Sequence, residues 1–302
     1  MTSGHESQLG RLSHALAAAT PPAAFLDALA RNLPEVMPGQ LWLARRGTRS
    51  LLVLICSVDG AMVELIPVTI DDGSNAEAVD LPAISSELAA PLTVWRALVS
   101  SVPMRTLESY CGQLLLDHSG GNVLDGIVKA GLPGPAAVSA ADPTLVLAAR
   151  LLDELDDFAG APLPGGTGEL PSVLKASGLG VRELGDLLEV PGATVLELRR
   201  GQRAISAEQA RTLAPVIDRD ATELLAANPT PPEPLVVWMS RPPQRRRISQ
   251  LSRLKNVDED TAFADATYST FALAARTSGD RGAESAWAAL GERYFQSVLD
   301  ES

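Results

Sequence analysis

The pattern of apolar and polar residues predicts a strand-rich first part of the chain. Three short runs rich in Val, Ile and Leu stand at Gln40–Arg45, Ser50–Val58 and Ala61–Ile70, and such runs are typical of β-strands. Asp59-Gly60 separates the second run from the third, and this dipeptide between apolar runs is a strong hairpin signal. Short strands at this spacing predict a small, strongly bent antiparallel barrel.

Further elements flank these strands. Leu9–Leu33 predicts a helical lead-in, Pro91–Leu98 a further strand, and Met104–Asp117 a closing helix. After them, apolar residues recur at helical spacing in Thr144–Phe158, which predicts one amphipathic helix with an acidic outer face. We expect this helix to pack on a neighbouring domain or on a second copy of itself.

Three Pro- and Gly-rich stretches divide the chain, at Gly131–Pro143, Gly160–Pro171 and Asn228–Pro234. Such mixtures end helices and serve as linkers. The predicted fold class is therefore α+β multidomain. Its expected parts are a helical N-terminal segment (1–36), a β-barrel (37–131), a connecting helix (144–160), an all-α domain (168–228), and a basic segment followed by a C-terminal helical hairpin (234–302).

The C-terminal part contains most of the aromatic residues of the chain. Asp258–Ser302 carries Ala-rich helical patterns with aromatics three to four residues apart, which predicts a packed hairpin. An exposed aromatic stripe would instead mark a dimer face or a ligand groove. The apolar run Pro234–Met239 before it is interpreted as a lone strand.

Composition narrows the classes of function. The formal net charge of −12 argues against a protein that coats nucleic acid by bulk charge. Local basic patches could still bind nucleic acid. Cys56 and Cys111 are too few for a disulfide framework or a cysteine zinc site. The sequence shows neither a signal peptide nor an apolar stretch of about 20 residues, so we expect a cytoplasmic protein without membrane contact.

The strand region carries short motifs of a known family. PGQLWLA (Pro38–Ala44), LIPVT (Leu65–Thr69) and VPMRTLESYCGQL (Val102–Leu114) resemble the SH3-like barrel of PemK/MazF-type toxin ribonucleases. The resemblance implies catalysis at the scissile phosphate by a threonine and an arginine of the first hairpin loop. The matching positions are Thr69 and one of Arg45, Arg46 and Arg49.

One departure from that family concerns the first hairpin loop, which is only a few residues long here but long in the toxins. In the alternative interpretation Thr69 is a strand-end residue and the arginines solvate a turn.

Residues 170–226 contain five short helical patterns. They resemble the lambda-repressor/Cro-like (XRE-type) helix-turn-helix domain, because apolar residues fall at its core positions and Arg199-Arg200-Gly201 matches the turn after its reading helix. The matching core positions are Leu179, Leu184, Leu187, Leu188, Val190, Val195, Leu198, Leu213 and Leu224. The resemblance implies that the second helix of the pair lies in the DNA major groove.

The reading helix has few side chains with which to distinguish bases. The three slots that contact bases in the family fall on Gly192, Ala193 and Glu197; of these, Glu197 alone could accept a hydrogen bond, from cytosine. Val181 replaces a glutamine that often holds a phosphate, and Glu189 replaces the usual glycine of the tight turn. Glu189 would cost up to about 1 kcal/mol if the turn keeps a left-handed conformation.

Positive charge is nevertheless present after the reading helix. Ser240–Lys255 adds a second cluster with six basic residues and no acidic one, which predicts a DNA-backbone contact or a minor-groove arm. A solvated loop, or a patch that docks on the acidic barrel, is the alternative. The predicted DNA contacts are Thr194, Glu197, Arg199, Arg200, Gln202, Arg203, Arg245, Arg246 and Arg247.

Signals for other chemistry are missing from the sequence. The histidines His5, His14 and His118 have no partner at metal-ligand spacing, and no phosphate-binding loop or dinucleotide fingerprint occurs. We therefore expect no metal, no cofactor and, apart from the barrel alternative, no enzyme.

Three functions follow from these patterns. The first is a DNA-binding transcriptional regulator that binds double-stranded DNA as a homodimer. The second is a metal-independent endoribonuclease toxin with a fused antitoxin-like domain. The third is a protein-interaction module with a degenerate helix-turn-helix and a protein partner.

Overall fold

The computed structural model describes residues 33–70, 79–82, 87–88, 91–114, 143–276 and 284–300. It has the mixed α+β content that the sequence predicts. The chain forms two compact units, Met1–Ala161 with Ser240–Arg246 and Pro162–Met239 with Arg247–Ser302. Within the described residues, none of the helices is both long and apolar enough to cross a bilayer. The three histidines and the predicted lead-in helix, except its last residue Leu33, fall outside these residues.

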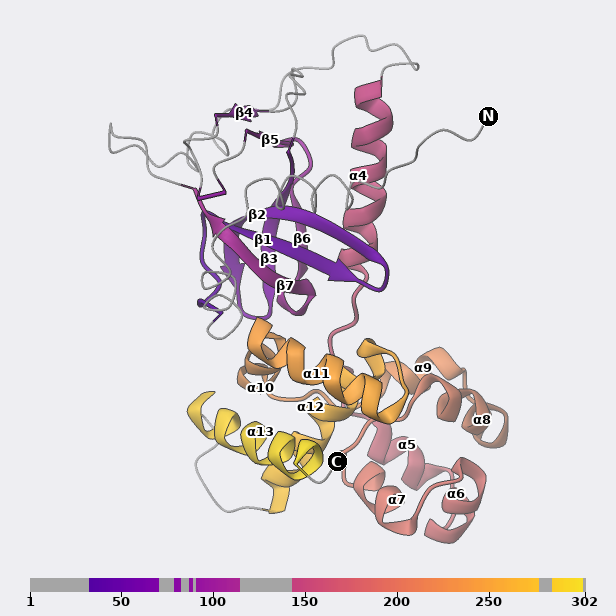
Figure 1. Ribbon diagram of the computed structural model, residues 1–302. Helices are drawn as coiled ribbons and strands as arrows, with labels where there is room; N and C mark the ends of the chain where they lie inside the picture. Colours follow the sequence, from indigo (N-terminus) through magenta and orange to yellow (C-terminus); the bar gives the residue numbers. More distant parts are fainter. Residues whose placement is uncertain are drawn as a thin grey trace. The chain divides into compact units, whose positions relative to one another are not determined.

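A seven-stranded antiparallel sheet dominates the first unit (Figure 1). Its strand order is β4-β5-β3-β2-β1-β7, and β6 pairs with β3 beside this path. The strands are β1 (Gln40–Arg46), β2 (Arg49–Asp59), β3 (Met62–Thr69), β4 (Val79–Leu81), β5 (Leu92–Val94), β6 (Ser100–Pro103) and β7 (Leu107–Gln113).

Two tight hairpins join the first three strands, as the sequence predicts. Arg46 pairs with Arg49 across the first turn, and Asp59 pairs with Met62 across the second. The first residue of each two-residue loop is a glycine with a φ of 56°. Such turns need a positive φ, which a glycine adopts without steric cost.

The predicted closing helix at Met104–Asp117 is wrong. Met104–Thr106 forms a single 3-10 turn (η2), and the chain continues as β7, which pairs with β1. The free edge of β1 needs hydrogen-bond partners, and β7 supplies them. Tyr110 of β7 also packs edge-on against Trp42 of β1, with ring centroids 5.6 Å apart. These non-local contacts outweigh the local helical pattern.

Helix α4 (Pro143–Ala159) belongs to the same unit and confirms the predicted helix at Thr144–Phe158. Leu151, Leu155 and Phe158 lie in the hydrophobic core that also contains Trp42. The sequence predicts an apolar stripe of Leu145, Ala148, Leu152 and Leu155. Ala148 and Leu155 are buried as predicted, whereas Leu152 is 45% exposed and Leu151 is buried instead.

The helices of the second unit form two clusters. The first contains α5 (Leu170–Ala176), α6 (Val181–Leu188), α7 (Gly192–Arg199), α8 (Ala207–Ile217) and α9 (Ala221–Ala226). The second is built from α10 (Glu233–Ser240), α12 (Glu259–Arg276), α13 (Glu284–Leu299) and part of α11 (Pro242–Lys255). The contacts between α12 and α13 confirm the predicted C-terminal hairpin.

Two predictions about this part are wrong. The expected lone strand at Pro234–Met239 is helix α10, because Leu235, Trp238 and Met239 recur at helical spacing and are buried together. The basic segment, for which a loop or an extended arm was expected, is helix α11. Close packing holds α10 against α13: any Cβ at Gly291 would collide with the ring of Trp238.

Candidate nucleic-acid interface

Helices α6 and α7 and the turn between them form the candidate site. Helix α6 ends at Leu188, and Glu189 then adopts a left-handed conformation with φ 53° and ψ 40°, as expected for this turn. The Val190 amide donates to the carbonyl of Gly185 at 3.0 Å and closes the turn. Pro191 is the N-cap residue of α7. The local structure is thus helix, tight turn, helix.

The nine apolar residues that the sequence assigns to the core of this domain lie in one hydrophobic cluster. Leu179, Leu187 and Val190 are partly buried in it, and the other six are buried. Burial of these side chains supplies most of the stability of short helices, since helices of six to eleven residues are marginal alone. The cluster therefore fixes the position of α7 relative to α5, α6, α8 and α9.

The surface of α7 is mostly apolar. Pro191, Gly192 and Ala193 are exposed at its first turn, and the side chain of Leu196 is 41% exposed one turn later. Thr194 is half-buried. Two of the three positions expected to contact bases, Gly192 and Ala193, are therefore on the surface, but they offer no side-chain hydrogen bond.

Glu197 and Arg203 form an ion pair, with Oε2 and Nη1 3.6 Å apart. Only 17% of the Glu197 side chain is exposed, against 39% for Arg203. The backbone amide of Gln202 donates to the Glu197 carbonyl at 2.9 Å and folds the chain back after α7. The third position expected to contact bases, Glu197, is thus paired with Arg203, which was itself expected to contact DNA.

The two neighbouring arginines differ in what they contact. The guanidinium of Arg199 is partly buried and donates to the carbonyl of Leu179, before α6. Arg200 is exposed at the C-cap of α7. Arg199 therefore braces the domain internally, whereas Arg200 faces solvent.

The arginines of α11 also have structural roles. Arg245 is 8% exposed, and its Nη1 donates to the backbone carbonyl of Arg105 at 2.5 Å. Nη1 of Arg247 lies 2.6 Å from Glu292, and its guanidinium stacks over Phe295 at 5.3 Å from the ring centroid. Arg246 between them is exposed. Of the three predicted DNA contacts here, Arg246 is exposed, Arg247 is half-buried and Arg245 is buried.

The alternative site, in the sheet domain, has a buried threonine. Thr69 is 2% exposed, and its hydroxyl accepts a hydrogen bond from the indole N–H of Trp95 at 3.0 Å. Arg45 pairs with Glu108 at 3.3 Å on the surface. A phosphate could reach Thr69 only after the strand end had opened.

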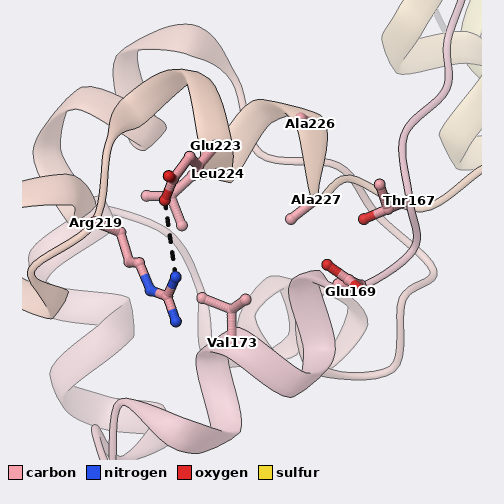
Figure 2. A pocket seen from close by; sticks show the side chains of 8 residues that line it. All are labelled: Thr167, Glu169, Val173, Arg219, Glu223, Leu224, Ala226 and Ala227. Atoms are coloured by element: carbon pink, nitrogen blue, oxygen red, sulfur yellow. Dashed lines mark ion pairs between the residues drawn. The ribbon is translucent and has the colours of Figure 1, made fainter.

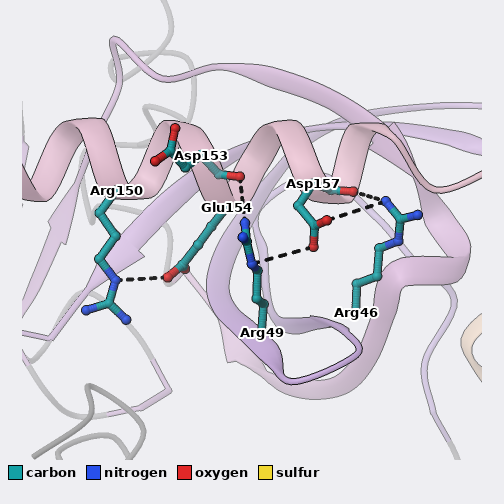
Figure 3. A network of polar contacts seen from close by, with 6 residues as sticks. All are labelled: Arg46, Arg49, Arg150, Asp153, Glu154 and Asp157. Atoms are coloured by element: carbon teal, nitrogen blue, oxygen red, sulfur yellow. Dashed lines mark hydrogen bonds and ion pairs between the residues drawn. The ribbon is translucent and has the colours of Figure 1, made fainter.

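Figure 3 shows where the other two hairpin arginines go. Arg46 donates to the backbone carbonyl of Asp157, and Arg49 donates to that of Asp153 at 3.0 Å. Both also lie 3.9 Å from the Asp157 carboxylate. Cations are favoured near the last carbonyls of a helix, so these contacts fasten the end of α4 to the first hairpin.

Neither of the two cysteines, Cys56 and Cys111, shows the lowered pKa of an activated nucleophile. Burial raises the pKa of the Cys56 thiol to about 12 and that of Cys111 to about 11, so both stay protonated and unreactive near neutral pH. Among the described residues, no group of three or more His, Cys, Asp or Glu side chains could hold a metal ion.

A cavity of about 270 Å³ opens between α5 and α9 (Figure 2). Arg219 and Glu223, 3.8 Å apart, line one side, and Glu169 and Val173 line the other. Both partners of the ion pair are more than half exposed. We assign no chemistry to this solvated depression.

Comparisons with known proteins add no identity: no family model, no curated protein and no solved structure matches this chain.

Proposed function

We propose that this protein is a DNA-binding transcriptional regulator of the helix-turn-helix type, with α7 as the helix that enters the major groove. The observation that carries the proposal is the pair α6–α7, joined by a tight turn through the left-handed Glu189, with the first turn of α7 exposed. The lambda-repressor/Cro-like assignment rests on this geometry and on the burial of the matching apolar positions. The protein is expected to bind as a homodimer.

The binding mode follows from what α7 exposes. Arg200 at one end of the helix, and the first-turn amides of Gly192 and Ala193 at the other, suit phosphate oxygens. The base-reading slots give little sequence selectivity, so we attribute specificity to half-site spacing and DNA shape. Affinity should fall steeply with salt, because phosphate contacts release counterions.

For the sheet domain we infer an SH3-like, PemK/MazF-like barrel that serves dimerisation or sensing. The support is that β7, after one 3-10 turn, pairs back with β1, while β6 pairs with β3 at the other side of the three-stranded meander. The buried Thr69 hydroxyl disfavours the endoribonuclease alternative. Intact RNA after prolonged incubation with concentrated protein would reject that alternative.

The test uses fluorescence anisotropy with a duplex from upstream of the protein's own gene and a random duplex, at 50–300 mM salt, a range set by the order of magnitude of counterion effects. Arg200→Ala should weaken binding to both duplexes about three- to tenfold at low salt and reduce the salt slope by about 1. Arg211→Ala, at an exposed arginine of α8, is the matched control and should change neither.

Two results would oppose the proposal. Absence of binding to either duplex at the lowest salt would reject DNA binding. Equal affinity for the two duplexes would reject specific regulation at this site.

A protein-interaction module is the second candidate, and the exposed Leu196 beside Gly192 and Ala193 favours it. An apolar, uncharged first turn suits a protein surface better than a phosphate backbone. In this case Leu196→Asp should abolish capture of a stable partner, and the wild-type protein should not bind DNA at about 150 mM salt.

A further inference from the structure

A second cavity in the helical unit, of about 210 Å³, lies where the turn after α7 meets α12 and α13. Glu197, Gln202 and Arg203 form its polar wall. Tyr268 and Leu273 of α12 and Val298 of α13 form much of the opposite wall. The cavity therefore joins an ion pair to an aromatic and aliphatic surface, which is the usual composition of a small-molecule site.

The ion pair in the polar wall is loose. Nη1 of Arg203 and Oε2 of Glu197 are 3.6 Å apart, which is too long for a hydrogen bond between these two atoms. The two charges attract each other, and a ligand that carries both charges can interact with the two groups at once. The backbone amide of Gln202 donates to the backbone carbonyl of Glu197. This hydrogen bond fixes the turn that brings the side chains of Glu197 and Arg203 together.

The opposite wall is held in place before any ligand binds. The hydroxyl of Tyr268 donates to the carbonyl of Pro229 at 2.9 Å, which fixes its ring. Helices α12 and α13 pack through Phe271 and Trp287, whose ring centroids are 6.3 Å apart. A preformed wall of this kind lowers the entropic cost of binding.

We propose that this cavity binds a small zwitterionic ligand of the α-amino-acid type. Its carboxylate would meet Arg203, its ammonium group would meet Glu197, and its apolar side chain would lie against Tyr268 and Leu273. A simple anion would face the Glu197 charge and a simple cation the Arg203 charge, whereas a zwitterion satisfies both. The volume lies below the range of about 300–1,000 Å³ for drug-sized ligands, and this suits a free amino acid.

The ligand also regulates DNA binding, a part of the inference that rests on the proposed function. Arg203 follows the candidate reading helix, and a carboxylate bound to it competes with a phosphate. Ligand and DNA therefore weaken each other by the same factor, as linkage requires. Ligand binding by itself needs no DNA and can be measured separately.

The first experiment is isothermal titration calorimetry of the 302-residue chain with each of the twenty free L-amino acids. We expect at least one apolar amino acid to bind with a Kd of about 1 mM or tighter. Its methyl ester and its N-acetyl derivative, each lacking one charge, should bind at least tenfold more weakly. Failure of all twenty, or equal binding of the two derivatives, overturns the site.

Variants separate this site from a general effect on folding. Glu197→Gln and Arg203→Gln should each weaken binding at least tenfold, and Glu208→Gln, at an exposed position of α8, should leave it unchanged. Ser269→Phe fills the cavity from α12 without altering the ion pair, and it should abolish binding in a protein whose Tm is within a few degrees of wild type. Unchanged binding in Ser269→Phe overturns the assignment.

The regulatory part has its own readout, anisotropy of a DNA duplex with and without the amino acid that binds. We expect a severalfold loss of DNA affinity at saturating ligand, absent in Arg203→Gln. Ligand binding with unchanged DNA affinity overturns the coupling and leaves the site. Ligand binding without any DNA binding overturns the proposed function instead.

Discussion

The first hairpin and the end of α7 each carry three arginines close together in the sequence, yet the two groups have different surroundings. Arg46 and Arg49 on the hairpin contact carbonyls and a carboxylate of α4. At the end of α7, Arg199 is bonded to Leu179 and Arg203 is paired with Glu197, but Arg200 faces solvent.

This comparison shows that the number of basic residues in a sequence cluster does not tell how many of them can contact a partner. A guanidinium has five N–H donors, and nearby backbone carbonyls can take several of them. What separates the two groups is what the arginine left at the surface contacts. On the hairpin Arg45 is 53% exposed but pairs with Glu108, whereas Arg200 faces solvent at the C-cap of α7, and this makes the α7 cluster the better candidate for nucleic acid.

The largest expected effect concerns Arg199. Arg199→Met should lower the free energy of unfolding by about 1.5–3 kcal/mol, because a hydrogen bond from a charged, partly buried donor is lost. Arg200→Met should change it by less than about 0.5 kcal/mol. Urea denaturation measures both. Equal losses would mean that the two arginines are not distinguished by their contacts.

On the hairpin, Arg46→Met should cost about 1 kcal/mol, since a cation near the last carbonyls of α4 is removed. Its side chain is 26% exposed. Arg45→Met is the matched change at a side chain that is 53% exposed, and it should cost less than about 0.5 kcal/mol. A larger loss for Arg45→Met in the same denaturation assay would contradict the assigned roles.

In the turn before α7, a substitution is expected to raise the stability of the protein rather than lower it. Glu189→Gly should raise the free energy of unfolding by roughly 0.5–1 kcal/mol, because glycine adopts the left-handed conformation without steric cost. Asp218 also has a positive φ, of 52°. Aspartate tolerates this region better than glutamate, so Asp218→Gly should gain less. Thermal denaturation of the two variants compares them, and a loss of stability in Glu189→Gly would refute the expectation.

The smallest effect concerns an acidic group that contacts backbone amides. Asp220 is the N-cap residue of α9, and hydrogen bonds from the backbone and side chain of Thr222 lower its pKa. A lowered pKa stabilises the fold above the unfolded-state pKa of about 3.9 and ceases to do so as the pH falls through the folded-state pKa.

Asp220→Asn keeps the cap acceptor but removes the titration. The stability difference between wild type and this variant should therefore shrink as the pH falls from about 5 to about 2. Urea denaturation at several pH values checks this. A difference that stays constant over that range would show that the ionised form contributes nothing.

Much of the fold could be predicted because its signals are local. The strands β1, β2 and β3 follow from apolar runs and Asp59-Gly60, and the five helices between residues 170 and 226 follow from apolar spacing. The strand β7 could not be predicted because its conformation depends on pairing with the edge of β1. The helix α10 could not be predicted because it depends on the packing of Trp238 in the core.

The candidate site was harder to predict than the fold. The positions of Gly192 and Ala193 on the surface of α7 follow from the helical period. The engagement of Arg199 depends on a carbonyl twenty residues earlier, at Leu179, and that of Arg245 on a carbonyl of a different domain segment. The residues next to an arginine in the sequence do not indicate which hydrogen-bond acceptor the fold places beside its guanidinium.

The packing of α4 has a practical consequence for dissecting this protein into fragments. A fragment cut before Pro143 would lose Leu151, Leu155 and Phe158 from the interior of the sheet domain and leave the apolar surface around Trp42 open to water. A cut between Ala161 and Pro162 retains all three side chains and the contacts of Arg46 and Arg49 with the helix, although it removes Ser240–Arg246, which belongs to the same unit. The N-terminal piece suited to separate expression therefore includes α4, although the sequence suggests a boundary in the Pro- and Gly-rich stretch before it.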